Sequence, residues 1–592
     1  MYILGIVEGH NCSAALMKDG EIVAVCFEER LSRLKNDLGY PRRAIESCLD
    51  QEGIRSDQID HVAMVTKNLP LGQVAVKREA TFSVEDHIRE QEEYWKPRLI
   101  DGLDPDYFSI FHDKLRLNEL SYDFIDLKTD RSSFANFLEI RKNTIKRHLS
   151  VKDTQIHCME HHLAHSMYAV FSNPACYEKD WLVLVADGYG DDCSASVGVW
   201  KNGKFDFIAK SPGSGIGRIY RYATLLLNMR PGVDEHKVMG LASYAKEPYC
   251  SKAKASFAPY LKVNGLVIDY TNQDKDIYFS LKERLKAARF DGIAGGLQMF
   301  AEEISVEWTR NAVRATGIPN IAFSGGVAMN IKVNMAMMEL DEVSDLFVGP
   351  SGGDESLSLG AAYALWHEKF NHIGPVKPLS HAYLGPSYSA TDAERALADT
   401  LPAGYNVIQN PSLELLARCL AEGRVLARSK GRMEFGARAL GNRSIIARAD
   451  DPRMLRRIND KIKRRDFWMP FAPMILAECW DAYVVDPKHV TSPYMTIAFN
   501  STDLAKDHLA AALHPADDTM RPQMVKRETA PDLHALMTAV RNECGLGGLL
   551  NTSLNLHGDP ICCTPEQSLR TFLNSDLDGL ILEDFLVARF QP

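Results

Sequence analysis

Apolar runs bounded by polar turns recur along the first part of the chain. Residues 2–7 and 22–27 are two such runs, with a Lys-Asp-Gly turn at 18–20 between them, and residues 181–186 lead on to a Lys-Asn-Gly turn at 201–203. Short apolar runs joined by glycine-containing turns predict β-hairpins. Longer helical stretches alternate with these runs, which predicts an α/β fold.

One of these hairpins occurs twice. Residues 9–14 (GHNCSA) return as residues 190–195 (GDDCSA), each copy following an apolar run. A hairpin turn with glycine and small hydroxyl residues brings backbone N–H groups close to a phosphate, because little side chain stands in the way. Two interpretations stay open at this point: a nucleotide cleft between two facing hairpins, or two ordinary hairpins of one α/β domain.

The pattern divides the chain into two domains. We predict a domain of two related halves over 1–375, interrupted by a charged helical insertion at 68–155 that shapes an acceptor pocket or forms a lid. Proline and glycine then punctuate a linker at 376–395. Residues 396–592 carry strands and cationic motifs of their own, which predicts a second α/β domain.

Composition narrows the class of protein. The 592 residues are 45% hydrophobic and 25% charged, as in an ordinary globular protein, and no apolar stretch reaches about twenty residues. The chain starts directly in a predicted strand, so we expect a cytoplasmic protein. A net charge of −10 argues against general nucleic-acid binding. Twelve scattered cysteines without a Cys-x-x-Cys pair indicate neither a disulfide scaffold nor a zinc knuckle.

Two histidines and two aspartates are candidate metal ligands. His161 and His165 are four residues apart in a predicted helix, so both imidazoles project from one face. Asp187 ends an apolar strand, and Asp354 follows a strand and a glycine turn. Such a mixed nitrogen and oxygen set suits a divalent ion with open positions for phosphate oxygens. A histidine pair with a purely structural role is the alternative.

A third glycine turn is a candidate anion site. Residues 321–330 predict a strand that passes through Ser324, Gly325 and Gly326 into a helix, whose N-terminus favours an anion. The glycine-rich residues 211–218 lack the Gly-Lys-Ser/Thr of a P-loop, and the spacing of a Rossmann fingerprint is absent.

Basic residues cluster at 453–465, against the overall charge. Apolar residues with helical spacing within 453–462 allow much of this charge to be the solvated face of a helix. Lys463 to Arg465 are predicted to leave the helix and to be better placed for an anion.

The ordered motifs resemble the O-carbamoyltransferases of the NodU/CmcH family. The resemblance spans almost the whole chain except 68–155. It rests on residues 10–15 (HNCSAA), 28–30 (EER), 161–165 (HHLAH), 187–188 (DG), 235–242 (EHKVMGLA), 324–330 (SGGVAMN), 353–354 (GD), 433–444 (MEFGARALGNRS), 463–465 (KRR), 470–473 (PFAP) and 550–555 (LNTSLN).

The resemblance implies an enzyme with two sites. The N-terminal domain would have a duplicated actin/hexokinase-like ATPase fold, as in tRNA threonylcarbamoyl-transferring proteins, and the C-terminal domain a threonylcarbamoyl-AMP synthase (YrdC-like) fold. The second domain would make carbamoyl-AMP from carbamoyl phosphate and ATP, releasing pyrophosphate. The first would pass the carbamoyl group to a hydroxyl of a small natural product, releasing AMP, as in antibiotic biosynthesis.

The resemblance also implies roles for single residues. His10 would be the general base, or alternatively a residue that holds phosphate. The ion would be Fe²⁺, with Zn²⁺ and Mn²⁺ left open, and ATP would bind with Mg²⁺. The implied metal ligands are His161, His165, Asp187 and Asp354; the nucleotide contacts in the transfer domain are Gly188, Ser324, Gly325, Gly326 and Asn330; the carbamoyl-AMP-forming site comprises Arg438, Arg443, Lys463, Arg465, Ser553 and Asn555.

Three positions depart from the family pattern. Met469 replaces a usual arginine before Pro-Phe-Ala-Pro, Ala437 a usual proline, and Asn11 a usual aspartate. The first departure removes a possible phosphate contact, for which Arg464 is a candidate substitute.

The alternatives are a tRNA-modifying enzyme of the threonylcarbamoyl type and a non-enzymatic nucleotide-dependent scaffold. We expect no membrane or nucleic-acid partner and a monomer or homodimer; no residue names the acceptor.

Overall fold

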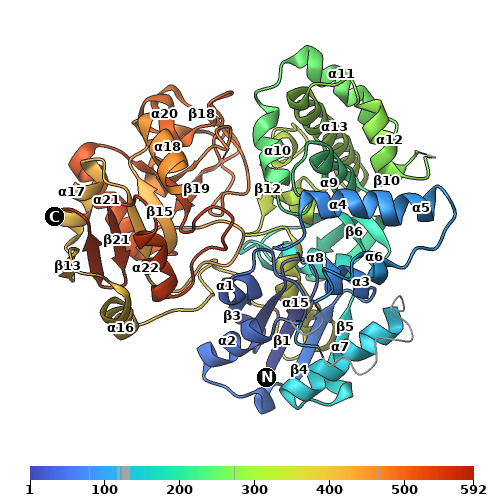
Figure 1. The fold of residues 1–592 in the computed structure, drawn as a ribbon, viewed down its shortest axis with the longest axis horizontal. Coiled ribbons are helices and arrows are strands. Elements are labelled where there is room, and N and C mark those ends of the chain that lie inside the picture. Colours follow the sequence, from blue (N-terminus) through green and yellow to red (C-terminus); the bar gives the residue numbers. More distant parts are fainter. Residues whose placement is uncertain (79, 117–119, 123–133, 273, 464–465, 592) are drawn as a thin grey trace. The chain divides into compact units, whose positions relative to one another are not determined.

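The computed structural model describes residues 1–592 apart from residues 79, 117–119, 123–133, 273, 464–465 and 592 (Figure 1). Arg464 and Arg465 therefore lie outside the described residues. Two compact units make up the chain, Met1–Leu379 and Ser380–Pro592, and the predicted linker 376–395 spans the division between them.

The first unit contains two five-stranded sheets with matching topology. Each sheet has three antiparallel strands in hairpin succession and continues through two parallel strands. This match confirms the predicted duplication of the glycine hairpin. The first sheet has the order β3(Glu21–Phe27), β2(Ser13–Lys18), β1(Tyr2–Val7), β4(His61–Val65), β5(Ile156–Met159); the second has β12(Asp345–Val348), β11(Asn320–Ser324), β6(Trp181–Gly190), β7(Cys193–Lys201), β8(Lys204–Ser211).

Two buried helices connect these sheets. Helix α15 (Leu357–Lys369) packs on β1, β2 and β4, and α8 (His161–Phe171) packs on β6 and β11 and against α15. A Cβ on Gly360 would lie 2.0 Å from the carbonyl oxygen of Ala164, so only glycine allows α15 to approach α8 this closely. Helix α8 therefore packs against both the second sheet and α15, and its first five residues include the two predicted histidine ligands.

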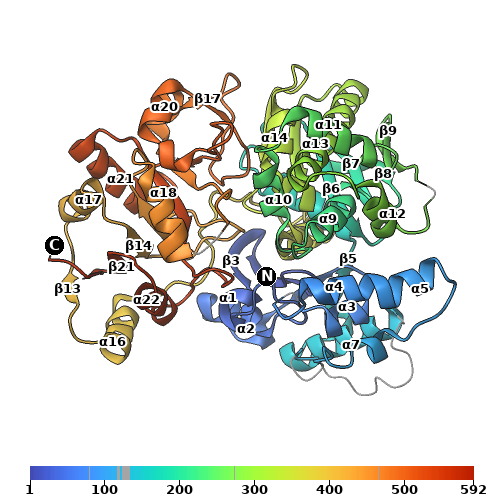
Figure 2. The ribbon, with the colours of Figure 1, turned by 45° about the horizontal axis from the view of Figure 1, so that its top comes forward.

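The remaining helices of this unit surround the sheets. In Figure 2, α11 and α13 lie side by side in the second half, where α13 also packs on α10 and α14. Outside the insertion these elements are α1(Glu28–Ser32), α2(Arg42–Glu52), α9(Ile216–Leu226), α10(Glu235–Ala242), α11(Glu247–Phe257), α12(Ile277–Arg284), α13(Phe290–Thr316) and α14(Ile331–Met338), with a small hairpin of β9(Leu261–Asn264) and β10(Val267–Tyr270).

The insertion joins β4 to β5 and contains several helices joined by turns and irregular segments. Its aromatic segment Glu90–Trp95 continues α4 as a π-helical turn, whereas residues 123–130 lie outside the described residues. The helices are α3(Leu71–Val76), α4(Val84–Arg89), α5(Lys96–Leu99), α6(Tyr107–Ile110) and α7(Phe134–Leu149).

One buried histidine of the insertion makes the folding stability of the first unit depend on pH. His87 is 4% exposed, and burial together with the positive charges of Arg221, Lys77 and Arg230 lowers the pKa of its imidazole to about 2. The unfolded chain takes up this proton near pH 6.5 and the folded chain does not, so acid favours unfolding by about 1.4 kcal/mol per pH unit below that value. This contribution to stability is fully present above about pH 6.5 and is lost as the pH falls.

We therefore expect His87→Leu to reduce the decrease in the free energy of unfolding at acidic pH. Between roughly pH 6.5 and 4.5, urea unfolding of the variant should lose about 2 kcal/mol less than the parent. His112→Leu, at an exposed histidine of the same segment, is the control and should follow the parent. Parallel curves for the parent and His87→Leu would contradict the assignment.

The second unit is built on one mixed eight-stranded sheet. Its strand order is β13(Asn406–Gln409), β22(Phe585–Ala588), β21(Gly579–Leu582), β14(Leu426–Ser429), β15(Arg443–Ala447), β20(Gly548–Ser553), β16(Ala472–Leu476), β19(Gln523–Val525). The other elements are α16(Ala390–Thr400), α17(Leu413–Ala421), α18(Arg453–Ile458), α19(Trp480–Tyr483), α20(Asp503–His508), α21(Pro531–Cys544), α22(Pro565–Leu573), β17(Val484–Val485) and β18(Asn500–Ser501).

The basic segment of this unit differs from its prediction in one respect. Lys463 was expected to have left the helix, but α18 continues as a π-helical turn over Asn459–Lys463. The chain therefore presents Lys463 from a helical end. Across the described residues, no helix combines the length and apolar character that crossing a membrane requires.

Candidate functional site

Helix α8 carries two of the four predicted metal ligands. It starts directly after β5, where the carboxylate of Glu160 caps it by accepting a hydrogen bond of 2.6 Å from the Leu163 N–H. Because residues four apart lie on one helix face, His161 and His165 direct their imidazoles to the same point. Both side chains are buried, with at most 4% exposure.

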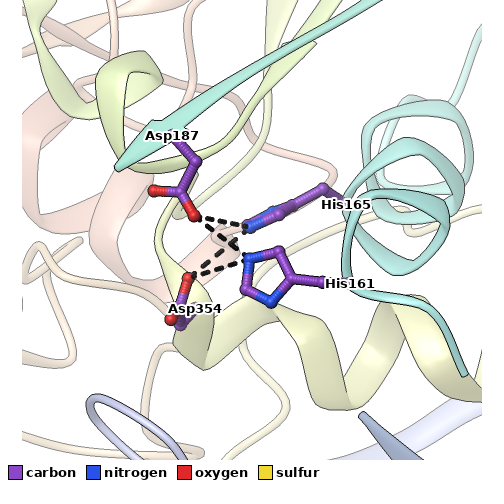
Figure 3. A group of neighbouring side chains, drawn as sticks. All are labelled: His161, His165, Asp187 and Asp354. Carbon is purple, nitrogen blue, oxygen red and sulfur yellow. Dashed lines mark hydrogen bonds and ion pairs between the residues drawn. The ribbon is translucent and has the colours of Figure 1, made fainter. Parts of the chain in front are cut away.

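The two aspartates come from the second sheet. Asp187 lies near the carboxyl end of β6, and Asp354 starts a 3-10 turn shortly after β12. Strands β6, β11 and β12 are parallel neighbours, so their carboxyl ends meet at one edge. In Figure 3 the two carboxylates and the two imidazoles point toward one another.

The four side chains form one compact group. His161 Nε2 lies 3.1 Å from Asp187 Oδ2 and 3.7 Å from Asp354 Oδ1, and His165 Nε2 lies 3.9 and 3.5 Å from the same two atoms. One donor atom from each residue lies within 4.8 Å of the other three. Donors bound to one ion at about 2.1 Å lie roughly 3 to 4 Å apart, so this spacing fits a divalent ion.

A buried nitrogen and the charges of the group also fit a metal. His165 Nε2 is buried and has no hydrogen-bond partner among the described residues, which is costly unless a ligand fills the position. Burial alone would lower the pKa of His161, but Asp354 and Asp187 outweigh it and raise that pKa to about 9. Burial opposes ionisation of Asp187, yet His161 holds the pKa of its carboxyl well below the usual range. The two carboxylates, Asp187 and Asp354, therefore favour a positive charge at this position.

Each imidazole is oriented by a hydroxyl on its other nitrogen. His161 Nδ1 lies 3.0 Å from Thr66 Oγ1, and His165 Nδ1 lies 3.2 Å from Ser324 Oγ. Both rings thereby turn Nε2 toward the aspartates. Thr66 had no place in the sequence interpretation, and the only local signal for it was its position directly after an apolar run. Ser324 was expected at a nucleotide; that role stays a prediction.

The predicted glycine turn lies against Asp187. Gly326 donates its N–H to Asp187 Oδ1 at 3.2 Å, and a Cβ there would lie 2.8 Å from that oxygen. Gly325 has φ +94°, and its Cβ would lie 2.2 Å from the Ala186 carbonyl oxygen. Only glycines let this turn pass so close to the metal group. Gly188 has open space where a side chain would be.

Two further predicted residues have defined places in this unit. Asn330 caps α14, because its side-chain oxygen accepts from the Lys332 and Val333 N–H groups. His10 lies partly exposed in the turn between β1 and β2. Their assigned roles in nucleotide binding and proton transfer stay predictions.

The second unit brings three predicted residues together. Lys463 is 4% exposed, and its ammonium donates to Ser553 Oγ at 3.2 Å and to the Asn555 carbonyl oxygen at 3.2 Å. It also donates to the Ser553 carbonyl and to Asn555 Oδ1. These contacts hold the Lys463 ammonium at the carboxyl end of β20.

The predicted arginines of this unit are placed differently. Arg443 is fully buried in β15, next to Ser444, which pairs with Ser553 of β20. Its Nε donates to the Cys563 carbonyl at 3.1 Å, while its Nη2 has no partner among the described residues. Arg438 lies in the loop between β14 and β15. Arg428, which the sequence interpretation missed, is buried and donates to the Gly441 carbonyl of that loop at 2.9 Å.

Two family models match the chain. Carbamoyltransferase N-terminus matches residues 2–363, which is more than half of the chain, and Carbamoyltransferase C-terminus matches residues 417–589. Together the matched ranges include the four candidate metal ligands and Lys463.

Curated relatives align with most of the chain. Protein MJ1051 of Methanocaldococcus jannaschii is 29% identical over 99% of both chains. Nodulation protein NolNO of Sinorhizobium fredii is 29% identical over 98% of this chain and 79% of its own. Among solved structures, full-length HypF in its phosphate- and nucleotide-bound form aligns with 64% of this chain and 56% of its own, at 11% identity and a TM-score of 0.32. The family matches and the relatives establish that this chain is a carbamoyltransferase and belongs to the NodU-type carbamoyltransferase family.

Proposed function

We propose that the chain is an ATP-dependent O-carbamoyltransferase that works through carbamoyl-AMP. The observation that carries the proposal is the group of two imidazoles and two carboxylates, because it can hold a cation next to a glycine turn suited to phosphate. The acceptor is a small hydroxylated molecule.

The first half-reaction belongs to the second unit, to which we assign the YrdC-like fold. Water hydrolyses carbamoyl phosphate to carbamate and inorganic phosphate, and a carbamate oxygen then attacks the α-phosphorus of Mg²⁺-bound ATP, releasing pyrophosphate and leaving carbamoyl-AMP. Both substrates are polyanions, so a buried ammonium such as that of Lys463 favours their phosphates. Arg438, Arg443 and Arg465 are assigned to the same phosphates, and Ser553 and Asn555 to the nucleotide.

The second half-reaction belongs to the first unit, to which we assign the actin/hexokinase-like fold. The acceptor oxygen attacks the carbamoyl carbon, AMP leaves, and the acceptor proton passes to a base, for which His10 is the candidate because imidazole titrates near neutral pH. A divalent ion, Fe²⁺ or else Zn²⁺ or Mn²⁺, held by the four ligands would neutralise charge on the adenylate phosphate. Gly188, Gly325, Gly326, Ser324 and Asn330 are assigned to the nucleotide.

Two measurements test the proposal. Incubation with ATP, Mg²⁺ and labelled pyrophosphate should give carbamoyl phosphate-dependent label exchange into ATP, which needs no acceptor. Mass spectrometry of hydroxylated metabolites incubated with the enzyme and both substrates should then show the gain of one carbamoyl group. ATP binding without exchange would favour a scaffold instead, and a salt-sensitive complex with tRNA would favour tRNA modification.

A further inference from the structure

A threonine with a strained backbone contacts one of the four candidate metal ligands, His161. Thr66 directly follows β4 and has φ +65°. A β-branched residue is rarely found in this left-handed region, because its side chain crowds the backbone. Such strain persists only where neighbouring contacts enforce it.

A buried arginine supplies those contacts. Arg141, from helix α7 of the insertion, donates from Nη1 to the Thr66 carbonyl at 2.7 Å and from Nη2 to the Val65 carbonyl at 2.8 Å. Its Nε donates to Glu8 Oε2 at 2.5 Å, and Tyr122 donates to the other oxygen of Glu8 at 3.0 Å.

This arginine is fixed by its surroundings. Arg141 and Glu8 are both fully buried, and a buried guanidinium with a paired carboxylate has almost no freedom to move. Two successive carbonyl oxygens of the β4 end are therefore held by one rigid fork.

The same loop is tied to helix α8 by a second bridge. One carboxylate oxygen of Asp191 accepts from the Asn68 N–H and the other from the His161 N–H, both at 3.0 Å. Together with the Thr66 hydroxyl at 3.0 Å from His161 Nδ1, this bridge fixes both the backbone and the ring of His161 relative to the loop.

The tautomer of His161 follows from this arrangement. An imidazole that binds a metal through Nε2 carries its proton on Nδ1, and that N–H needs an acceptor. Thr66 Oγ1 is in the position to accept it, as Ser324 Oγ is for His165.

We propose that Thr66, held in a left-handed conformation by the buried Glu8–Arg141 pair, is a positioning residue that sets the ring orientation and tautomer of His161 for metal binding. This inference rests on the proposed metal site. It gives the insertion at 68–155 a role, because Arg141 is the insertion residue that enforces the Thr66 conformation. The hydroxyl acts through His161 and does not contact the ion.

The test compares three variants with the full-length parent. Thr66→Val removes the hydroxyl and keeps the β-branched shape, Thr66→Ser keeps the hydroxyl, and Thr144→Val removes another buried threonine hydroxyl, which bonds the Ile140 carbonyl within α7. Affinity for Co²⁺ and Zn²⁺ is measured by competition with a chelator, and the visible absorption of the Co²⁺ form reports ligand geometry. Melting of the metal-free proteins separates misfolding from a site defect.

We expect Thr66→Val to lose about tenfold to a hundredfold in metal affinity and to change the Co²⁺ spectrum. Thr66→Ser and Thr144→Val should bind as the parent does, and the metal-free Thr66→Val should melt within a few degrees of the metal-free parent. Parent-like affinity and an unchanged spectrum for Thr66→Val would overturn the inference. Equal losses in Thr144→Val would also overturn it, because they would mark a general packing effect.

His165→Ala, measured in the same competition, separates this inference from the proposed function. If His165→Ala loses the metal and Thr66→Val keeps it, the metal site stands and only the positioning role fails. If the parent itself takes up no metal, the proposed site fails with it.

Discussion

The His165→Ala variant is expected to lose at least about a hundredfold in metal affinity and nearly all carbamoyl transfer to an acceptor. The physical reason is geometric, because His165 Nε2 is the buried donor without a partner and lies 3.5 and 3.9 Å from the two carboxylates. Without the His165 imidazole only three ligands remain to bind the ion, and the negative charges of the two carboxylates are less well balanced. Metal analysis after gel filtration, followed by an acceptor assay, measures both effects.

The same variant should keep its carbamoyl phosphate-dependent exchange of pyrophosphate into ATP, because that step is assigned to the other unit. His157→Ala is the matched control: it removes a histidine of the same unit, which contacts His61 and Lys369 and lies outside the ligand group. Full metal occupancy and parent-like transfer by His165→Ala would refute the site.

The Lys463→Met variant should lose at least about a hundredfold in pyrophosphate exchange while it retains bound metal. Methionine replaces the stem of the side chain but not its charge, so the phosphates of two anionic substrates lose a buried partner. The measured quantity is the rate of labelled pyrophosphate entering ATP with and without carbamoyl phosphate.

Lys430→Met serves as the control within the same unit. Lys430 pairs with Asp584 at 2.8 Å in a partly exposed ion pair, and removal of such a pair leaves the exchange rate near that of the parent. If Lys463→Met exchanges normally while His165→Ala does not, the two half-reactions have been assigned to the wrong units.

The sequence predicted the features that depend on local pattern. The hairpins follow from turn residues that lie within a few positions of the strands they join. The pairing of His161 with His165 follows from helical spacing alone. Asp187 and Asp354 were found because each follows an apolar strand, and the carboxyl ends of parallel strands meet at one edge of a sheet.

The environment of these ligands could not be predicted in this way. Glu8 and Arg141 are 133 residues apart, and their pairing depends on how α7 packs rather than on any periodicity. Thr66 has a left-handed backbone, which a β-branched residue rarely adopts, so local sequence preference does not predict it and tertiary contacts are needed to enforce it. The helical position of Lys463 was missed because the apolar repeat ends at Ile462, whereas the π-helical turn carries the helix one residue farther.

The two copies of the glycine hairpin have diverged. A Cβ on Gly9 would meet only a Leu69 side-chain atom at 3.9 Å, whereas on Gly190 it would lie 2.1 Å from the His161 ring. The left-handed residue of the turn is Asn11 in the first copy and Asp191 in the second, one repeat position earlier. The second turn therefore admits no side chain at Gly190 unless the His161 ring shifts, whereas the first has room for one at Gly9.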